Sequence, residues 1–332
     1  MFALYASTAA PGTVFGDPSE YQFIPAIGGI AHPPGYAFYT LLAKLWQTLV
    51  PLGSVAFRTN LLASAVGAGV VTAVYFIVLD LGQAISDQRA GNPLIPLFSA
   101  LALAAAPDLW QHAAHANAHI VSAALAMCHL ALLVRWWRTG KTGWLAGFAV
   151  TLGLAASHHP VTLMGAPAYA VFILVVRPRI LREWRMLLVL LGCLLVGLLP
   201  FLYFPLRSPS APFGPTDMRT WEGFIGHATA RGLRVNLFHF GLADQPDRLV
   251  VFASLLALQF AGPTLCLLPF GAARLARRAA KPALLLGIFL FVHLAFTMNT
   301  VQDVMAYLLL PFSALAIVVG AGAHMVVSCL AS

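Results

Sequence analysis

Long apolar runs recur along the whole chain and decide its fold class. They approach the ~20 residues that a helix needs to cross a bilayer, and they lack the alternation of a transmembrane barrel. Because backbone groups in hydrocarbon must be satisfied within the segment, such runs indicate helices. The sequence predicts an all-α, polytopic transmembrane bundle that forms a single domain over residues 1–332. The expected spans are 54–80, 94–110, 118–134, 143–157, 160–176, 186–204, 249–270, 283–298 and 306–327.

The first ten residues form a short apolar segment that ends at Pro11 and Gly12. At ~1.5 Å per residue this segment crosses about half a bilayer. It has neither the charged start nor the length of a signal peptide. We interpret it as the end of a truncated first span, which brings the expected number of spans to about ten.

Two polar segments, 11–53 and 205–247, are too long to be simple turns between spans. Long loops in a compact membrane protein are usually functional. The short loops near 107–119, 157–160 and 299–303 fall on the same side of the predicted topology. We therefore expect chemistry at this face.

Composition and charge support the membrane assignment and orient the chain. The sequence is 60% hydrophobic and 9% charged, with a mean hydropathy of +0.84, whereas soluble domains are about a quarter charged. Most Lys and Arg residues fall in loops on one side, which the positive-inside rule makes cytoplasmic. The net charge of +8 then reflects topology, and no nucleic-acid partner is expected. The basic residues of these loops are Arg89, Arg135, Arg138, Lys141, Arg177, Arg179, Arg182, Arg185, Arg274, Arg277, Arg278 and Lys281.

The first long loop begins with the motif GDPSEY, which contains Asp17 and Glu20. Residues three apart share a face of a helix, and Pro18 is suited to the first turn. Asp17 could simply cap this helix. Alternatively, it could act as a general base at the membrane surface, with Glu20 assisting it.

Longer motifs link the chain to a known family. They are AHPPGYAFYTLLAKLW (31–46), GSVAFRTNLL (53–62), YFPLRS (203–208), TWEGFIGHATAR (220–231) and DVMAYLLLP (303–311). In this order they resemble the GT-C-type transmembrane glycosyltransferases that are protein O-mannosyltransferase-like, the family of the animal plexin-type receptor O-mannosyltransferase. The resemblance implies that Asp17, the acidic residue of the first external loop, is the catalytic base.

The same resemblance implies an inverting glycosyltransferase. It would move a sugar, mannose, from a polyprenyl- or dolichyl-phosphate donor to an acceptor hydroxyl of protein Ser or Thr, or of a lipid, on the extracytoplasmic side. We expect it in the inner membrane of a bacterium, or in the endoplasmic reticulum membrane if the chain is eukaryotic.

Site residues follow from the motifs and their place in the topology. A guanidinium at the outer interface matches the geometry of a lipid phosphate, so Arg207 and Arg231 are predicted to bind it; anchoring to phospholipid headgroups is the alternative for Arg207. We further predict that Asp17, Glu20, His32, Arg207 and Asp303 line one cavity. The residues predicted to shape this substrate cavity are His32, Tyr36, His158, His159, His227, Asp303 and Tyr307.

Three histidines, His112, His115 and His119, recur at one face of a helix and raise the question of a metal. Histidines that line a wet polar cavity are the alternative, and no cofactor is expected.

Two other functions stay open. A secondary transporter or channel would place ionisable residues near the bilayer midplane, where His129 and His293 are the main candidates. A catalytically degenerate member would fit the departures from the family pattern at Ser19, at 213–216 and at 114–119.

Overall fold

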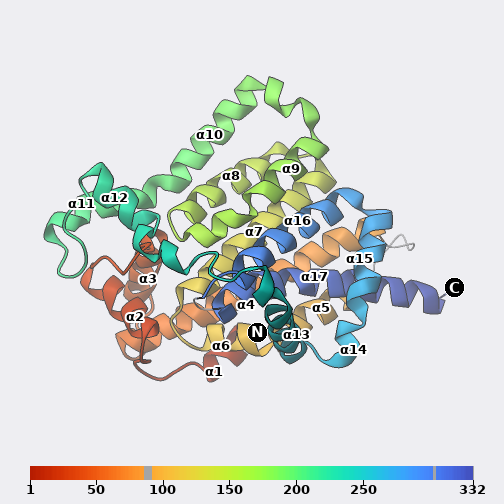
Figure 1. Cartoon of the computed structure of the whole chain (residues 1–332), viewed down its shortest axis with the longest axis horizontal. Coiled ribbons are helices and arrows are strands. Elements are labelled where there is room, and N and C mark those ends of the chain that lie inside the picture. Colours follow the sequence, from red (N-terminus) through yellow and green to blue (C-terminus); the bar gives the residue numbers. More distant parts are fainter. Residues whose placement is uncertain (86–91, 302–303, 332) are drawn as a thin grey trace.

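The computed structural model describes residues 1–85, 92–301 and 304–331. The described residues are helical and contain no strand, which confirms the all-α prediction. The helices α2 and α3 lie on one flank of the bundle, and α10 runs along its edge (Figure 1). The N-terminal half contains α1 (Phe2–Ser7), α2 (Asp17–Ile27), α3 (Ala37–Leu49), α4 (Val55–Ile85), α5 (Leu94–Ala104), α6 (Pro107–Ala114), α7 (Ala118–Thr139) and α8 (Thr142–Ala156). The rest contains η1 (Pro160–Gly165), α9 (Ala166–Val176), η2 (Pro178–Arg182), α10 (Trp184–Leu198), η3 (Leu199–Leu202), α11 (Tyr203–Arg207), η4 (Ser208–Ser210), α12 (Trp221–Ala228), η5 (Arg231–Asn236), η6 (Leu242–Asp244), α13 (Gln245–Gln259), α14 (Gly262–Leu265), α15 (Leu267–Arg278), α16 (Ala280–Met298) and α17 (Val304–Ala331).

Five helical segments of the described chain are long and apolar enough to cross a membrane. The number rises to seven if each of two bent helix pairs counts as one span, and α8 and the η1–α9 segment are shorter apolar helices. The chain is therefore a multi-pass membrane protein. By these criteria the described residues contain fewer spans than the ten or so that the sequence predicts. The five segments are Val55–Ile85, Ala118–Thr139, Trp184–Ser210, Ala280–Met298 and Val304–Leu330.

Two expected spans, 94–110 and 249–270, are not continuous helices. The first bends by 66° between α5 and α6, and the second bends by 115° between α13 and the α14–α15 segment. Pro107 and Pro263 lie at the starts of the second helices. Proline has no N–H to donate and restricts the residue before it, so each run breaks there.

Burial separates the inner helices from the outer ones. The most apolar stretch of α17 is 83% buried and that of α7 is 72% buried, whereas that of the Trp184–Ser210 segment, which begins with α10, is 11% buried. Two pairs of helices approach each other closely at glycines. Gly153 of α8 faces Gly197 of α10, and Gly271 of α15 contacts Gly322 of α17. A Cβ at Gly197 would lie 2.0 Å from the Val150 carbonyl oxygen, so small residues are required, as in other membrane helix pairs.

The basic end of the bundle is held by a buried carboxylate. Asp80, near the end of α4, is 4% exposed and forms ion pairs with Arg135 and Arg138 at the end of α7. The distance from Arg138 Nη1 to Asp80 Oδ1 is 3.1 Å. The ends of α4 and α7 that carry the predicted cytoplasmic charges therefore meet; Arg89 lies outside the described residues.

The opposite end is organised around the side-chain amide of Asn60, a fully buried residue of α4. Its Nδ2 donates to the carbonyl oxygens of Ala10 (2.7 Å) and Gly12 (3.0 Å). Its Oδ1 accepts from Gln22 Nε2 of α2 and from the backbone N–H of Ala116, both at 2.8 Å. One amide thus joins the N-terminal segment, α2, α4 and the connection between α6 and α7.

We predict that Asn60→Ala lowers the free energy of unfolding by about 3 kcal/mol, because several buried polar groups lose their partner. Thr72→Ala is the matched control, since the Thr72 hydroxyl lies exposed on the same helix and bonds to the Ala68 carbonyl of its own helix. Thermal unfolding of both variants in detergent measures the difference. Equal transition midpoints for the two variants would contradict this role of Asn60.

Candidate functional site

The helix α2 presents the first candidate residue at its start. Gly16 adopts a left-handed φ of 84° and Pro18 occupies the first turn, which starts the helix directly at Asp17. Asp17 is exposed, and the N-cap position of α2 is held by Gly16 rather than by Asp17. Its carboxylate is therefore accessible to a substrate.

Glu20, one turn later, is hydrogen-bonded to His32. The backbone N–H of His32 donates to Glu20 Oε1 (2.7 Å), and His32 Nδ1 lies 2.5 Å from Glu20 Oε2. Burial by itself raises the pKa of Glu20, but the two bonds from His32 outweigh it, so that the pKa of this carboxyl is lowered. The ionised Glu20 thus fixes the His32 ring.

Two hollows flank Asp17. We call the first the proline-lined hollow; it has a volume of about 440 Å³. We call the second the α6 hollow; it has a volume of about 400 Å³. Both volumes are typical of small-molecule sites, and both hollows include His119 as well as Asp17. The proline-lined hollow is formed by Asp17, His32, Pro33, Pro34, Tyr36, His119, His159, Pro160, Val161, Met164, Thr229, Ala230, Leu233, Leu237, Phe296 and Tyr307. The α6 hollow is formed by Asp17, Pro18, Tyr21, Gln111, His112, His115, Asn117, His119, Met305 and Ala306.

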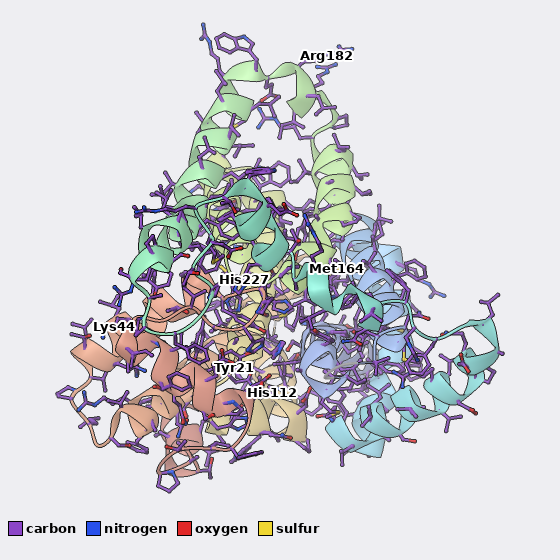
Figure 2. All side chains as sticks on the ribbon, turned by 60° about the vertical axis from the view of Figure 1, so that its left-hand side comes forward. Tyr21, Lys44, His112, Met164, Arg182 and His227 are labelled. Atoms are coloured by element: carbon purple, nitrogen blue, oxygen red, sulfur yellow. The ribbon has the colours of Figure 1, made fainter. Side chains whose placement is uncertain are left out.

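Figure 2 shows where these groups lie. Tyr21 of α2 and His112 of α6 lie close together near the centre of this view and line the same hollow, and His227 of α12 lies above them in the view. Residues of the first long loop, of the α6–α7 connection and of α17 line the α6 hollow together with Asp17. The resemblance of the chain to the family, carried by motifs far apart in the sequence, predicted that these segments meet. No local sequence pattern indicates such a contact.

Five of the predicted residues, Asp17, His32, Tyr36, His159 and Tyr307, line the proline-lined hollow. Tyr36 stacks on the His159 ring at a centroid distance of 5.4 Å. The hollow is thus walled by aromatic and imidazole rings, a surface that suits a ligand with both apolar and hydroxyl-bearing faces.

The other predicted histidines lie next to this hollow. His158 is 1% exposed, and its Nε2 donates to the Ala118 carbonyl at 2.9 Å. Burial lowers the pKa of His158 to about 4, and burial together with neighbouring histidines lowers the pKa of His159 well below its usual range. Both rings are therefore neutral near pH 7. His227 lines a third hollow with Glu20 and His32, and its Nε2 bonds to the Ala31 carbonyl at 3.0 Å.

The prediction that Arg207 shares a cavity with Asp17 is wrong. Arg207 Nε donates to the Gly28 carbonyl (2.6 Å), Nη2 to the Ile27 carbonyl (3.4 Å) and Nη1 to Ser210 Oγ (3.3 Å). It lines a separate, mainly apolar hollow with Leu41 and Leu206. The last carbonyls of a helix lack partners within the helix, and the guanidinium supplies donors to the end of α2. Asp303, the other distant member of the predicted set, lies outside the described residues.

Arg231 directly follows a segment of the chain that belongs to the candidate site. It follows Thr229 and Ala230, which line the proline-lined hollow. Its Nη1 lies 3.4 Å from Glu222 Oε1, in an ion pair whose side chains are 52% and 87% exposed. Such an exposed pair is weak, so the Arg231 guanidinium can exchange this partner for another anion.

The predicted histidine trio is not grouped as metal ligands within the described part of the chain. His112 Nδ1 is bonded to Asp108, at 2.8 Å from its carbonyl oxygen and 3.1 Å from Oδ1. The metal-ligand atoms that do come together, within 4.8 Å of one another, are those of Asp17, Glu20 and His32. The spacing of Asp17 and Glu20 signalled two of the three members of this cluster, whereas the contribution of His32 depends on how the loop folds back.

Comparisons with known proteins agree with this architecture. Residues 17–181 match the family model described as the protein O-mannosyl-transferase TMEM260 N-terminal domain. The chain is 32% identical to the protein O-mannosyl-transferase TMEM260 of Mus musculus over 244 residues, which cover 68% of the chain and 32% of the relative. The corresponding protein of Dictyostelium discoideum is 24% identical over 246 residues, covering 68% of the chain and 29% of the relative. The chain therefore spans about a third of the length of these relatives.

A solved structure shares the fold over almost the whole chain. It is the crystal structure of ArnT from Cupriavidus metallidurans bound to undecaprenyl phosphate, with a TM-score of 0.65 and 17% identity. The similarity covers 96% of the chain and 58% of ArnT. At this identity the likeness establishes the fold alone, which is a GT-C fold.

We predict that acid weakens the fold partly through Glu20. Because the pKa of Glu20 in the folded chain lies below its ordinary value of 4.5, its ionised form stabilises the fold above that pH, and the contribution is lost as the pH falls through the lowered pKa. Glu20→Gln should therefore lose less stability than the wild type when acidified below pH 4.5. Thermal unfolding at several pH values tests this. Glu222→Gln is the control, because it changes a largely exposed carboxylate, and its stability should depend on pH as that of the wild type does. If the stability of Glu20→Gln also falls in parallel with the wild type, the prediction for Glu20 is wrong.

Proposed function

Since the chain has the GT-C fold and resembles the protein O-mannosyltransferase-like family, we propose that it is a membrane glycosyltransferase that uses a lipid-phosphate sugar donor. The donor is a polyprenyl-phosphate sugar, and the sugar is mannose. The acceptor is a hydroxyl group of protein Ser or Thr. The name of the mouse relative supports mannose and a protein acceptor, and the undecaprenyl phosphate bound to ArnT supports the class of lipid.

The observation that carries this proposal is the position of Asp17 between two hollows of ligand size. A transfer reaction needs an acceptor and a donor on either side of one reacting carbon. An exposed carboxylate that both hollows share can reach the point where the two substrates meet.

In the proposed step, the oxygen of the acceptor hydroxyl attacks the anomeric carbon of the sugar. Asp17 accepts the proton of that hydroxyl as the new carbon–oxygen bond forms. The bond between the anomeric carbon and the phosphate oxygen breaks, and its electron pair leaves with the lipid phosphate. Because attack and departure take place on opposite faces of the carbon, the configuration of the sugar is inverted.

The neighbouring residues support this step by position rather than by proton transfer. Glu20 holds the His32 ring through two hydrogen bonds, and His32 then forms part of the wall beside Asp17. His159 is neutral near pH 7 because burial lowers its pKa. The Nδ1 atom of His159 accepts from the Val161 N–H at 3.0 Å, so the neutral ring keeps its Nε2–H to donate, which suits a hydroxyl oxygen of a sugar.

Arg231 is the proposed partner of the donor phosphate. Its neighbours Thr229 and Ala230 line the proline-lined hollow, and its bond to Glu222 is exposed and long. A guanidinium can form two parallel bonds to phosphate oxygens. Arg207 is less suited, because its donors already serve the end of α2.

We predict that Asp17→Asn reduces turnover by about 10²–10⁴-fold, the usual contribution of a general base, while the donor still binds. Transfer of radiolabelled mannose from polyprenyl-phosphate mannose to an acceptor peptide measures turnover. Asp247→Asn is the control, because Asp247 is also an exposed carboxylate near the start of a helix. If Asp17→Asn works at the wild-type rate, Asp17 is not the base. If the wild type shows no transfer, the proposed activity fails.

We predict that Arg231→Ala raises the KM for the donor by at least about tenfold, as expected for loss of a charge-assisted bond of ~1.5–3 kcal/mol. Arg231→Lys should restore part of the loss, since it keeps the charge but not the planar group. Donor titrations of both variants provide the measurement, with Arg219→Ala as an exposed arginine control. An unchanged KM in Arg231→Ala would remove Arg231 from the donor site.

A further inference from the structure

A groove between α8 and α10 lies at the end of the bundle opposite to Asp17. The end of α8 leads into His158 and His159, whereas its first turn lines this groove, about 20 Å away for a helix of this length. The groove has a volume of about 720 Å³. In Figure 2, Arg182 marks this end of the molecule. The α8–α10 groove is lined by Thr142, Gly143, Ala146, Arg182, Glu183, Trp184, Arg185, Met186 and Val189.

The groove exists because the two helices touch elsewhere. Gly153 and Gly197 bring the backbones together, about 15 Å along α8 from its first turn. Near that first turn the α8 wall carries small residues, Gly143 and Ala146, which leave space between the helices. A Cβ added at Gly143 would meet no heavy atom within 4 Å. In a membrane, such a space between apolar helices is filled by another molecule.

The chemistry of the groove changes from its mouth to its wall. Arg182 and Arg185 place two guanidinium groups at the mouth. The first turn of α8 has no side-chain cap, so its N–H groups add positive potential on the same side. Glu183 adds little negative charge of its own, because Arg177 binds both of its oxygens at 2.9 and 2.8 Å.

The wall below the mouth is apolar. Ala146, Met186 and Val189 line it, and the exposed side chains of α10 continue this surface along the helix. Trp184, at the mouth, is 62% exposed, and tryptophan is enriched where membrane hydrocarbon meets water. The exposed apolar residues of α10 include Leu187, Leu188, Val189, Leu191, Leu195 and Val196.

We propose that the α8–α10 groove binds a phospholipid with an anionic headgroup. Its phosphate lies between Arg182, Arg185 and the first-turn amides of α8, and an acyl chain follows the wall of α10. Two arginines and a helix start exceed the charge of one phosphate, so a lipid with net negative charge binds better than a zwitterionic one. The apolar wall selects a lipid over a free phosphate. This site is independent of the proposed transfer reaction.

Native mass spectrometry of the full chain in detergent tests this site, with phosphatidylglycerol and phosphatidylcholine offered at equal concentration. We expect one retained phosphatidylglycerol per chain, bound at least about tenfold more tightly than phosphatidylcholine, in line with a loss of ~1.4 kcal/mol or more. Glycerol phosphate should not compete at the same concentration. Equal retention of the two lipids, or displacement by glycerol phosphate, would overturn the proposal.

Two kinds of variant locate the binding. Gly143→Leu fills the groove without changing charge, and Gly192→Leu makes the same change where a Cβ also meets open space, on α10 outside the groove lining. Arg182→Gln with Arg185→Gln removes the charges of the mouth, and Arg277→Gln with Arg278→Gln removes the same charge elsewhere on the basic end.

Only Gly143→Leu and the Arg182/Arg185 variant should lose the retained lipid, and each should keep the wild-type thermal transition of the lipid-free chain to within a few degrees. Retention by Gly143→Leu at the wild-type level would refute the groove as the site. An equal loss in the Arg277/Arg278 variant would show diffuse attraction instead.

Discussion

The amide of Asn60 is the contact on which the arrangement of the candidate site depends. It binds Ala10, Gly12, Gln22 and Ala116, which belong to segments separated by up to about a hundred residues. A buried amide that is fully bonded tolerates no alternative partner of different geometry, because each unsatisfied group is costly. The segments that it joins lead directly to Asp17 and to the α6–α7 connection. The shape of the two hollows thus depends on the hydrogen bonds of Asn60, a polar side chain inside an apolar bundle.

Gln47 reinforces the same arrangement from a second helix. Its Nε2 donates to the Gln22 carbonyl and to Thr59 Oγ1, at 2.9 and 2.8 Å. Since Thr59 and Asn60 are adjacent on α4, α2 and α3 are both fixed to one turn of that helix. The first long loop is therefore packed against the bundle through specific hydrogen bonds and is not a loosely attached linker.

The helical fold could be predicted from the sequence because apolar length is a strong signal in a membrane protein. The segments now described as α4, α7, α16 and α17 follow directly from it. The breaks before Pro107 and Pro263 were missed, because each apolar run taken as a whole has the length of a single span. Hydropathy averages over a window, whereas one missing N–H changes the direction of the chain.

The candidate site was predictable to a different degree at each residue. Asp17 and Glu20 share a local motif, and its helical spacing correctly places them together. Arg207 could not be assigned in the same way, since a guanidinium fits helix-end carbonyls and phosphate oxygens equally well. Which of these it meets depends on where Gly28 lies after folding, and no spacing in the sequence encodes that distance. The resemblance to a family identified a segment, but not the partner of each side chain in it.

The deep burial of α17 has a consequence for biogenesis. This helix is the last one of the described chain, yet 83% of its most apolar stretch is enclosed by earlier helices, and it contributes Tyr307 to the proline-lined hollow. Ribosomes deliver helices in order, so the earlier spans enter the membrane around a vacant centre. They must stay loosely associated until α17 is inserted among them. A nascent chain that lacks α17 therefore has no finished proline-lined hollow, because Tyr307 and the packing around it arrive only when α17 is inserted.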